Sequence, residues 1–358
     1  MTDHPAAGQE QMFSWIAGLT DQLRDSAAFA GLDTVKRLAN PPSQILFCGM
    51  GGSAQAAGLI ADGWPDLMVP VWVHRDAGLP AWAGPETLVI ACSHSGNTAE
   101  TLAALSEAQR RGCLLAAVTS GGEVLAVARG EQGGEVFPAV VLPAGQPPRT
   151  VMPAALGALL HLLHRLGLLP DPTNDIMAAT AQLDTDLLVQ LDGSEPVGRS
   201  GARSLAADLG RRYTVVYTAG QEAHGAGRRL VAQLNENGKA PGHHAVFPEL
   251  THNEIVGWNL SPDQCRTFAL VVLMGQDMTV DDSQRVAATL DLLSDQFSSV
   301  HRIQAHGSQR LTRLLGLILF GDLVSAEVAV STDVDPVPIA RIDALKSCLA
   351  QLPPKGSS

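Results

Sequence analysis

Residues 87–98 read Thr-Leu-Val-Ile-Ala-Cys-Ser-His-Ser-Gly-Asn-Thr and join an apolar run to the start of an amphipathic helix. The β-branched first half predicts a strand, and the apolar spacing that follows predicts a helix over 98–111. Ser93, Ser95 and Thr98 place three hydroxyls where the helix start offers unpaired backbone N–H groups and the positive end of its dipole. The stretch therefore predicts a phosphate-binding turn, with a purely structural turn as the alternative.

A second strand-to-helix turn lies upstream, where residues 45–48 lead into Gly49-Met50-Gly51-Gly52-Ser53 and an Ala-rich helix. In an open α/β sheet ligands bind at the carboxyl ends of the strands, so turns on neighbouring strands would face one ligand. We therefore expect Gly51, Gly52 and Ser53 to contribute to binding of the same ligand. A glycine-rich turn alone is also typical of nucleotide-binding folds and of tight bends.

Length and composition narrow the class of protein. The chain has 358 residues, which favours two domains, and 46% of them are hydrophobic, enough for buried cores. The formal net charge of −12 disfavours nucleic acid and anionic membranes as partners. No apolar run is expected to span a bilayer, and no signal peptide is recognisable.

Five scattered cysteines lack the paired spacing of a metal site and are typical of buried thiols in a reducing compartment. His243 and His244 are adjacent, so on a strand they point to opposite faces. We therefore expect a cytoplasmic protein without a metal or other cofactor.

Strand and helix patterns alternate along the chain, which predicts the α/β class with parallel sheets flanked by helices. The expected strands begin at 45 and 87 and cover 69–73, 114–118, 135–142, 213–217, 244–247, 268–274 and 300–304. The expected helices cover much of the first 40 residues, 53–62, 98–111, a short stretch after 122, 152–166, a segment ending at 191, 200–209, 225–237, 283–297, 309–330 and 335–346. We place the domains at 1–168 and 169–358.

The second half repeats the architecture of the first but not its phosphate turn, since Thr218-Ala219-Gly220-Gln221 carries fewer hydroxyls. One phosphate site per chain is therefore expected.

Two further segments carry a resemblance. They are Asn235-Glu236-Asn237-Gly238-Lys239 and Phe247-Pro248-Glu249-Leu250-Thr251-His252-Asn253-Glu254. Together with residues 93–98 and Arg149, they make the chain resemble the bifunctional phosphoglucose/phosphomannose isomerases, two-domain members of the sugar isomerase (SIS) superfamily. The resemblance runs from the Gly49 turn to the terminal helix, and it implies two SIS-type domains with doubly wound, flavodoxin-like sheets.

The resemblance also implies roles for individual residues. Glu236 would be the base that moves the proton, His252 the group that opens the sugar ring, and Arg149 the cation beside C1 and C2. Those that would bind the substrate phosphate are Ser53, Ser93, Ser95 and Thr98. Lys346 matches a lysine that relatives direct toward the site. The family histidine is thought to come from the neighbouring subunit, which implies a homodimer with active sites at the subunit interface.

The implied chemistry is physically consistent. Aldose–ketose conversion moves a proton between adjacent carbons through an enediol, and one carboxylate such as Glu236 can take and return it. A histidine titrates near neutrality, which suits ring opening. The enediolate needs a fixed positive charge nearby, and the guanidinium of Arg149 supplies one.

Each of these residues also has an ordinary structural interpretation. Glu236 could be a solvated helix residue, His252 a helix cap, Arg149 a salt-bridged helix-start residue and Lys346 an exposed charge. His94 stands where the family often has tyrosine, and Gly238 where it usually has alanine. Val337 stands where many relatives have a threonine credited with accepting both glucose and mannose epimers.

The sequence therefore predicts a metal-independent isomerase that interconverts glucose 6-phosphate, mannose 6-phosphate or both with fructose 6-phosphate. One alternative is another SIS enzyme that acts on an amino sugar or heptose phosphate. A second is a non-catalytic sugar-phosphate sensor. A nucleotide-binding dehydrogenase is least favoured, because the Gly49 turn lacks the third spaced glycine of the dinucleotide fingerprint.

Overall fold

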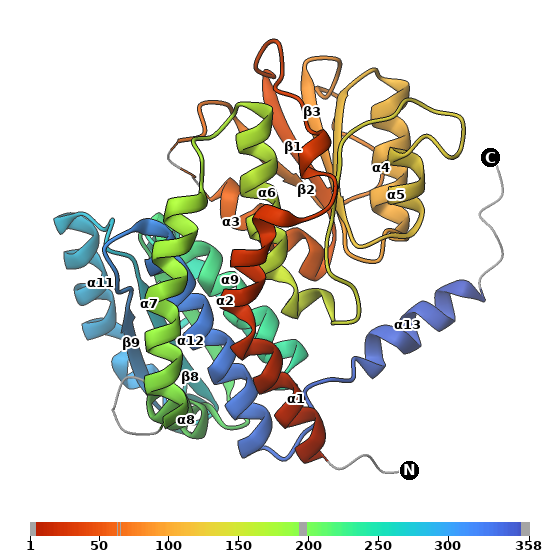
Figure 1. Cartoon of the computed structure of the whole chain (residues 1–358). Coiled ribbons are helices and arrows are strands. Elements are labelled where there is room, and N and C mark those ends of the chain that lie inside the picture. Colours follow the sequence, from red (N-terminus) through yellow and green to blue (C-terminus); the bar gives the residue numbers. More distant parts are fainter. Residues whose placement is uncertain (1–4, 63, 65, 193–198, 352–358) are drawn as a thin grey trace.

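The computed structural model describes residues 5–62, 64, 66–192 and 199–351, and it contains two parallel sheets (Figure 1). The first sheet has the strand order β2-β1-β3-β4-β5 and the second has β7-β6-β8-β9. Every neighbouring pair of strands is parallel. The first order is that of the flavodoxin-like doubly wound fold, and the second follows it without a fifth strand. The predicted fold class is confirmed.

The bounds of the elements are as follows. The strands are β1 (Gln44–Gly49), β2 (Val71–His74), β3 (Thr87–Ser93), β4 (Leu114–Thr119), β5 (Ala139–Val141), β6 (Tyr213–Ala219), β7 (Gly242–Val246), β8 (Phe268–Met274) and β9 (Val300–Gln304). The helices are α1 (Pro5–Ala17), α2 (Leu19–Asp25), α3 (Gln55–Ala61), α4 (Ala99–Arg110), α5 (Gly122–Ala128), α6 (Met152–Leu166), α7 (Thr173–Asp192), α8 (Arg199–Leu209), α9 (Gln221–Glu236), α10 (Pro262–Cys265), α11 (Val280–Leu293), α12 (Arg310–Ser331) and α13 (Ala340–Ala350).

Helices cover both faces of each sheet because alternate strand residues are apolar on both sides. On β1, Ile45 and Phe47 pack with α3 and α6, whereas Leu46 and Cys48 face the side of α4. In the second sheet, α8, α9 and α12 cover one face, and α11 covers the other. The cluster that contains α6, α9 and α12 runs continuously between the two halves.

α12 corrects one expectation from the sequence. By length and composition it could span a bilayer, but 78% of its most apolar window is buried inside the protein. Such burial is typical of the core helix of a globular protein. Its predicted bounds were otherwise accurate to one residue.

Several other predicted bounds need correction. The N-terminal segment forms two helices that end at Asp25, rather than helix to about residue 40. β5 covers only Ala139–Val141, because Phe137 donates its backbone N–H to Ala128 O and so belongs to the turn after α5. α11 begins at Val280 because Thr279 and Asp282 form a capping box. The proposed domain boundary at residue 168 stays a prediction.

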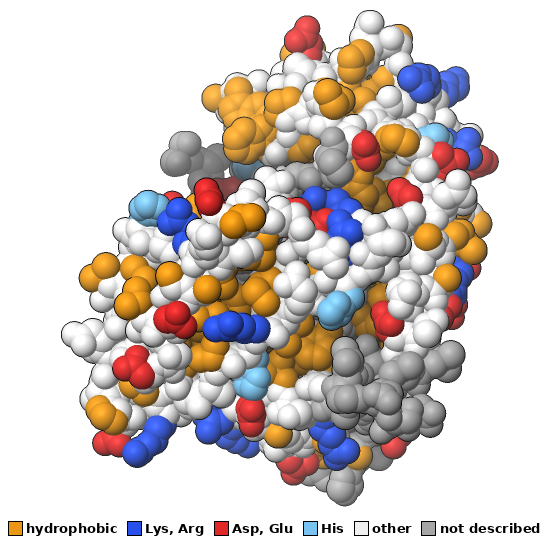
Figure 2. Space-filling model, turned by 90° about the vertical axis from the view of Figure 1, so that its left-hand side faces the viewer, with side chains coloured by type: hydrophobic (Ala, Val, Ile, Leu, Met, Phe, Trp, Pro, Cys, Tyr) orange, Lys and Arg blue, Asp and Glu red, His pale blue; other side chains and the backbone are white. Residues whose placement is uncertain are grey.

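The surface offers two further observations. On the face drawn in Figure 2, Lys and Arg side chains are scattered and do not form one broad basic patch. α13 extends away from the rest of the chain (Figure 1), and all side chains from Arg341 to Leu349 are exposed.

Candidate active site

The two predicted phosphate turns meet at the carboxyl ends of the adjacent strands β1 and β3. Ser53 Oγ accepts a hydrogen bond from His94 N at 3.0 Å, which ties one turn to the other. Ser93 Oγ lies 2.9 Å from Thr98 Oγ1 and accepts from Gly96 N at 3.1 Å. Ser95 Oγ accepts from Asn97 N at 3.2 Å. The four hydroxyls are therefore gathered at the switch point of the first sheet, where doubly wound folds bind ligands.

Two glycines make this close approach possible. Gly96 has a φ of +69°, and a Cβ there would lie 1.8 Å from Gly121 O. A Cβ on Gly52 would lie 2.9 Å from Arg149 N, so glycine lets the backbone of Arg149 sit against the first turn. Gly51 is exposed, with nothing within 4 Å of its virtual Cβ.

Arg149 lies in the short turn Pro148–Thr150 and is only 2% exposed. Its Nε donates to Asn237 Oδ1 at 2.8 Å, and its Nη2 donates to Pro336 O at 3.0 Å and Val337 O at 2.9 Å. Its Nη1 is directed to Glu236 Oε2 at 3.4 Å. Burial lowers the pKa of Arg149 and the Glu236 charge raises it, but a guanidinium remains ionised at neutral pH.

Glu236 is the last residue of α9, and its side chain is 26% exposed. A carboxylate is unfavourable at a helix C-terminus, where the dipole is negative. Two cations compensate for it: Arg149 meets the carboxylate, and Lys239 Nζ donates to the main-chain oxygen of Glu236. Glu236 is therefore not an ordinary solvated helix residue, because its carboxylate pairs with a buried arginine from the other half of the chain.

Lys239 links Glu236 to the segment before α13. Its Nζ also donates to Pro338 O at 2.7 Å and Pro336 O at 3.2 Å. Burial lowers the pKa of Lys239, and the nearby Arg149 charge lowers it further. Three consecutive carbonyls, those of residues 336–338, thus face the two cations. We call residues 336–338 the terminal strap.

His252 lies apart from this cluster in the described structure. It ends the turn Glu249–His252 and is exposed, and among the described residues it forms no hydrogen bond or ion pair with Arg149 or Glu236. Its loop is fixed by Glu254, whose Oε1 accepts from Tyr217 OH and His243 Nε2, each at 2.8 Å. His244 points to the opposite face and lies 2.8 Å from Thr218 Oγ1, which confirms the predicted alternation.

The structure thus gathers six predicted residues into two groups. Arg149 pairs with Glu236, its backbone lies against the first turn at Gly52, and the turns hold Ser53, Ser93, Ser95 and Thr98. Lys346 is exposed on α13 and has no contact with them in the described structure. The sequence interpretation missed Asn237, Lys239 and the strap carbonyls as partners of Arg149 and Glu236. Asn237 and Lys239 belong to the segment Asn235-Glu236-Asn237-Gly238-Lys239, so this motif could have indicated their roles.

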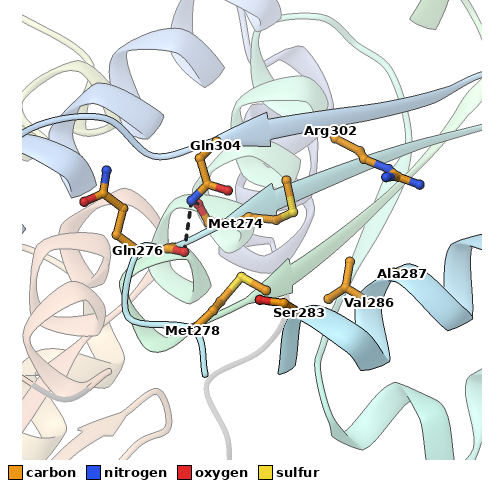
Figure 3. A pocket seen from close by; sticks show the side chains of 9 residues that line it. Met274, Gln276, Met278, Ser283, Val286, Ala287, Arg302 and Gln304 are labelled. Atoms are coloured by element: carbon orange, nitrogen blue, oxygen red, sulfur yellow. Dashed lines mark hydrogen bonds between the residues drawn. The ribbon is translucent and has the colours of Figure 1, made fainter. Parts of the chain in front are cut away.

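A separate cavity of about 510 Å³ opens where β8 and β9 end (Figure 3). Gln304 lines it, and its Nε2 donates to Met274 O at 3.2 Å and Gly275 O at 3.1 Å. The lining includes none of the six residues above, so this cavity belongs to the second sheet alone.

Several known proteins and one family model are similar to this chain. Residues 199–349 match the family model described as the bacterial phospho-glucose isomerase C-terminal SIS domain. A bifunctional phosphoglucose/phosphomannose isomerase from Caldicellulosiruptor bescii is 32% identical over 95% of this chain and 99% of its own length. A D-glucosamine-6-phosphate 4-epimerase from Sulfolobus acidocaldarius is 25% identical over 80% of this chain and 82% of its own.

Among solved structures, a hypothetical protein from Thermus thermophilus is similar, with a TM-score of 0.71 and 18% identity. The match covers 97% of this chain and 94% of that one. At this identity the likeness concerns the fold.

Proposed function

Because this chain belongs to the bifunctional phosphoglucose/phosphomannose isomerase family, we propose that it interconverts glucose 6-phosphate, mannose 6-phosphate or both with fructose 6-phosphate. The observation that carries the proposal is the Arg149–Glu236 pair, 3.4 Å apart, with the backbone of Arg149 against the turn that ends at Ser53. A base and a fixed cation next to a phosphate-binding turn are what an enediol mechanism needs. The proposed reaction involves no metal.

Phosphate binding is assigned to Ser53, Ser93, Ser95 and Thr98. In the described structure these hydroxyls bond to one another and to backbone amides of the turns. A phosphate dianion would accept from the same hydroxyls and amides at the start of α4. This anchor fixes the far end of the sugar and leaves C1 and C2 to the Arg149–Glu236 pair.

Proton transfer is assigned to Glu236. Its carboxylate would remove the proton from C2 of the aldose and return it to C1, and such positioned transfer contributes about 10²–10⁴-fold. Negative charge then develops on the O1 and O2 atoms. The Nη1 group of Arg149 faces Glu236, so it lies beside the place where this charge would appear.

Ring opening is assigned to His252, which would come from a second copy of the chain in a homodimer. Two observations support assembly. His252 is exposed, and α13 exposes Ile342, Leu345 and Leu349 at 42%, 58% and 56% on one apolar stripe. An apolar stripe on a projecting helix favours a protein partner. In the dimer, Lys346 of α13 would approach a site that it does not reach within one chain.

A cytoplasmic location is also proposed. All five cysteines are free, and the four in the body of the protein are buried. Free thiols are typical of proteins kept in a reducing compartment.

A second candidate is an enzyme that acts on an amino-sugar phosphate. The likeness to a D-glucosamine-6-phosphate 4-epimerase favours keeping it in the test. His94 is the residue that could alter the sugar environment, since it lies inside the phosphate turn and its Nε2 contacts Pro143 O at 3.1 Å.

The deciding experiment measures product identity from a panel of hexose, heptose and amino-sugar phosphates. Fructose 6-phosphate formed from glucose or mannose 6-phosphate supports the proposal. Turnover of amino-sugar phosphates alone supports the second candidate, and binding without turnover of any substrate indicates a sensor.

Glu236→Gln tests the base. We expect loss of turnover by at least about 10³-fold with fructose 6-phosphate binding nearly unchanged, because the amide keeps the shape but cannot take a proton. Retained activity would remove Glu236 from the mechanism. Unchanged activity after treatment with a chelator is also expected, and loss that zinc restores would contradict the metal-independent scheme.

A further inference from the structure

Asn237 is a fully buried amide in contact with the guanidinium of Arg149. It is 0% exposed, and its Oδ1 accepts from Arg149 Nε at 2.8 Å. Its Nδ2 donates to Ser325 Oγ at 3.0 Å, and Ser325 Oγ donates to Asp322 O at 2.7 Å. One side of Arg149 is thus connected through Asn237 to α12.

The main chain of Arg149 is connected to the same turn of α12 by a second route. Arg229 Nη2 donates to Arg149 O at 2.9 Å. The same guanidinium meets Asp322, with Nε to Oδ1 at 2.9 Å and Nη2 to Oδ2 at 2.6 Å. Asp322 and Ser325 lie three residues apart, so they share one face of the helix. The two routes close into a ring that holds both the guanidinium and the main-chain carbonyl of Arg149.

The ring and the terminal strap together select which edge of the guanidinium stays available. Of its five N–H groups, one meets Asn237 and two meet the carbonyls of Pro336 and Val337. Only the Nη1 pair remains, and it faces Glu236. Rotation of the guanidinium would turn this pair away from the base, so its orientation depends on the acceptor at Nε.

We propose that Asn237 is a positioning residue that sets the edge of Arg149 presented to the enediolate. The proposal rests on the proposed isomerase function. Asn237 does not touch the substrate; it acts through Arg149. Because it directly follows Glu236, one residue pair fixes the base and the orientation of the cation opposite it.

The test compares Asn237→Leu and Ser325→Ala with Ser26→Ala. Ser26 is a matched control because it is also 0% exposed, and its Oγ donates to the carbonyl three residues back, Leu23 O, at 2.6 Å. It has no bond to the ring around Arg149. Removing Ser26 therefore reproduces the loss of a buried serine without the loss of the Asn237 partner.

The readouts are kcat, KM for fructose 6-phosphate, the melting temperature, and the inhibition constant of 5-phosphoarabinonohydroxamate, a planar analogue of the enediolate. For Asn237→Leu we expect kcat to fall about 10²-fold and the hydroxamate to bind about 10²-fold more weakly, with KM within about threefold, since a small misplacement of a catalytic group has effects of this size. Ser325→Ala should shift kcat and hydroxamate binding in the same direction by about fivefold. Ser26→Ala should change only the melting temperature.

The outcomes distinguish failure of the proposed isomerase function from failure of the positioning role of Asn237. If the wild-type protein does not isomerise hexose 6-phosphates, the proposed function and this inference both fall. If the wild type is active and Ser325→Ala matches Ser26→Ala in every readout, the function stands and the positioning role is wrong. Should Asn237→Leu fail to fold, Ser325→Ala alone decides the question.

Discussion

The loops that follow β3 and β8 at the carboxyl ends of the two sheets have the same length. They differ in charge, because only the second contains a carboxylate that caps a helix start. In the first sheet, β3 ends at Ser93 and Thr98 is the N-cap of α4; in the second, β8 ends at Met274 and Thr279 is the N-cap of α11. In the part of the chain that the structure describes, no carboxylate accepts a hydrogen bond from the loop over 93–98. Its amides bond to serine hydroxyls, which can exchange for phosphate oxygens.

The second loop supplies its own anion. Asp277 Oδ2 accepts from Glu222 N at 3.2 Å, at the start of α9. The Asp277 carboxylate lies so close to Gly220 and Gly275 that a Cβ on either would be 2.3 Å from Oδ1. Glu222, itself paired with Arg313, accepts from Gln276 N at 3.2 Å. The second sheet thus places its own carboxylates where the first sheet, in the proposed site, would bind a phosphate.

The comparison gives a physical reason for the prediction of one phosphate site per chain instead of two. Helix starts attract anions in both halves. The difference is made by the residues at equal positions in the loop: Gly96 in the first loop corresponds to Asp277 in the second.

The largest expected effect comes from giving the first loop a carboxylate of its own. Ser95→Asp should lower kcat/KM by about 10²–10³-fold, because like charges placed together cost several kcal/mol. Gln276→Glu adds the same charge at the corresponding position of the second loop and should leave kcat/KM within about twofold. Steady-state kinetics of both variants test this prediction. Equal losses of kcat/KM would show that the two loops do not differ in the way proposed.

Substitution of the two N-cap threonines should affect different quantities, KM for Thr98 and stability for Thr279. Thr98 makes no capping bond and instead contacts Ser93, whereas Thr279 accepts from Asp282 N. Thr98→Val should raise KM about tenfold with little change in stability, and Thr279→Val should lower the free energy of unfolding by about 1 kcal/mol without changing KM. Urea unfolding and kinetics on both variants test this. A larger effect of Thr98→Val on kcat than on KM would argue against phosphate anchoring.

The smallest expected effect is the pH dependence of the stability that the Glu222–Arg313 pair contributes. Burial raises the pKa of Glu222, but the hydrogen bonds and charge of Arg313 outweigh it and leave the pKa below its ordinary value. A depressed pKa means that the paired carboxylate stabilises the fold above the unfolded-state pKa of about 4.5 and that this stability is lost as pH falls through the folded-state pKa.

The unfolding free energies of wild type and Glu222→Gln should therefore differ most at pH 7 and converge as the pH falls below about 4.5 and through the lowered folded-state pKa. Urea titrations at several pH values measure this. Asp263→Asn, which removes an exposed pair with Arg266, serves as the control for the loss of a surface carboxylate. A gap that widens in acid would contradict the assigned ion pair.

Much of this fold was predictable because its signals are local. The apolar run before Ser93 and the hydroxyl-rich turn after it are contiguous, so strand, turn and helix follow from spacing alone. β8 and β9 were predicted with correct bounds for the same reason. β5 was predicted too long because its limit depends on a tertiary bond, from Phe137 N to Ala128 O.

The candidate site was predictable only in part. Arg149 and Glu236 came from the family resemblance, and their contact depends on chain segments 87 residues apart. No local sequence pattern indicates that the carbonyls of residues 336–338 face two cations, since every residue has a carbonyl. Asn237 is a similar case, because its role depends on Ser325, one turn along a helix from Asp322.

The terminal strap has a consequence for how the protein is made. The two acceptors of Arg149 Nη2 lie 187 and 188 residues later in the chain, so they leave the ribosome well after Arg149 does. Until they emerge, a buried guanidinium lacks two acceptors, which is costly. Catalytic competence should therefore arise only after residue 337 has been made, and premature termination before residue 336 should yield a chain with two formed sheets and no activity.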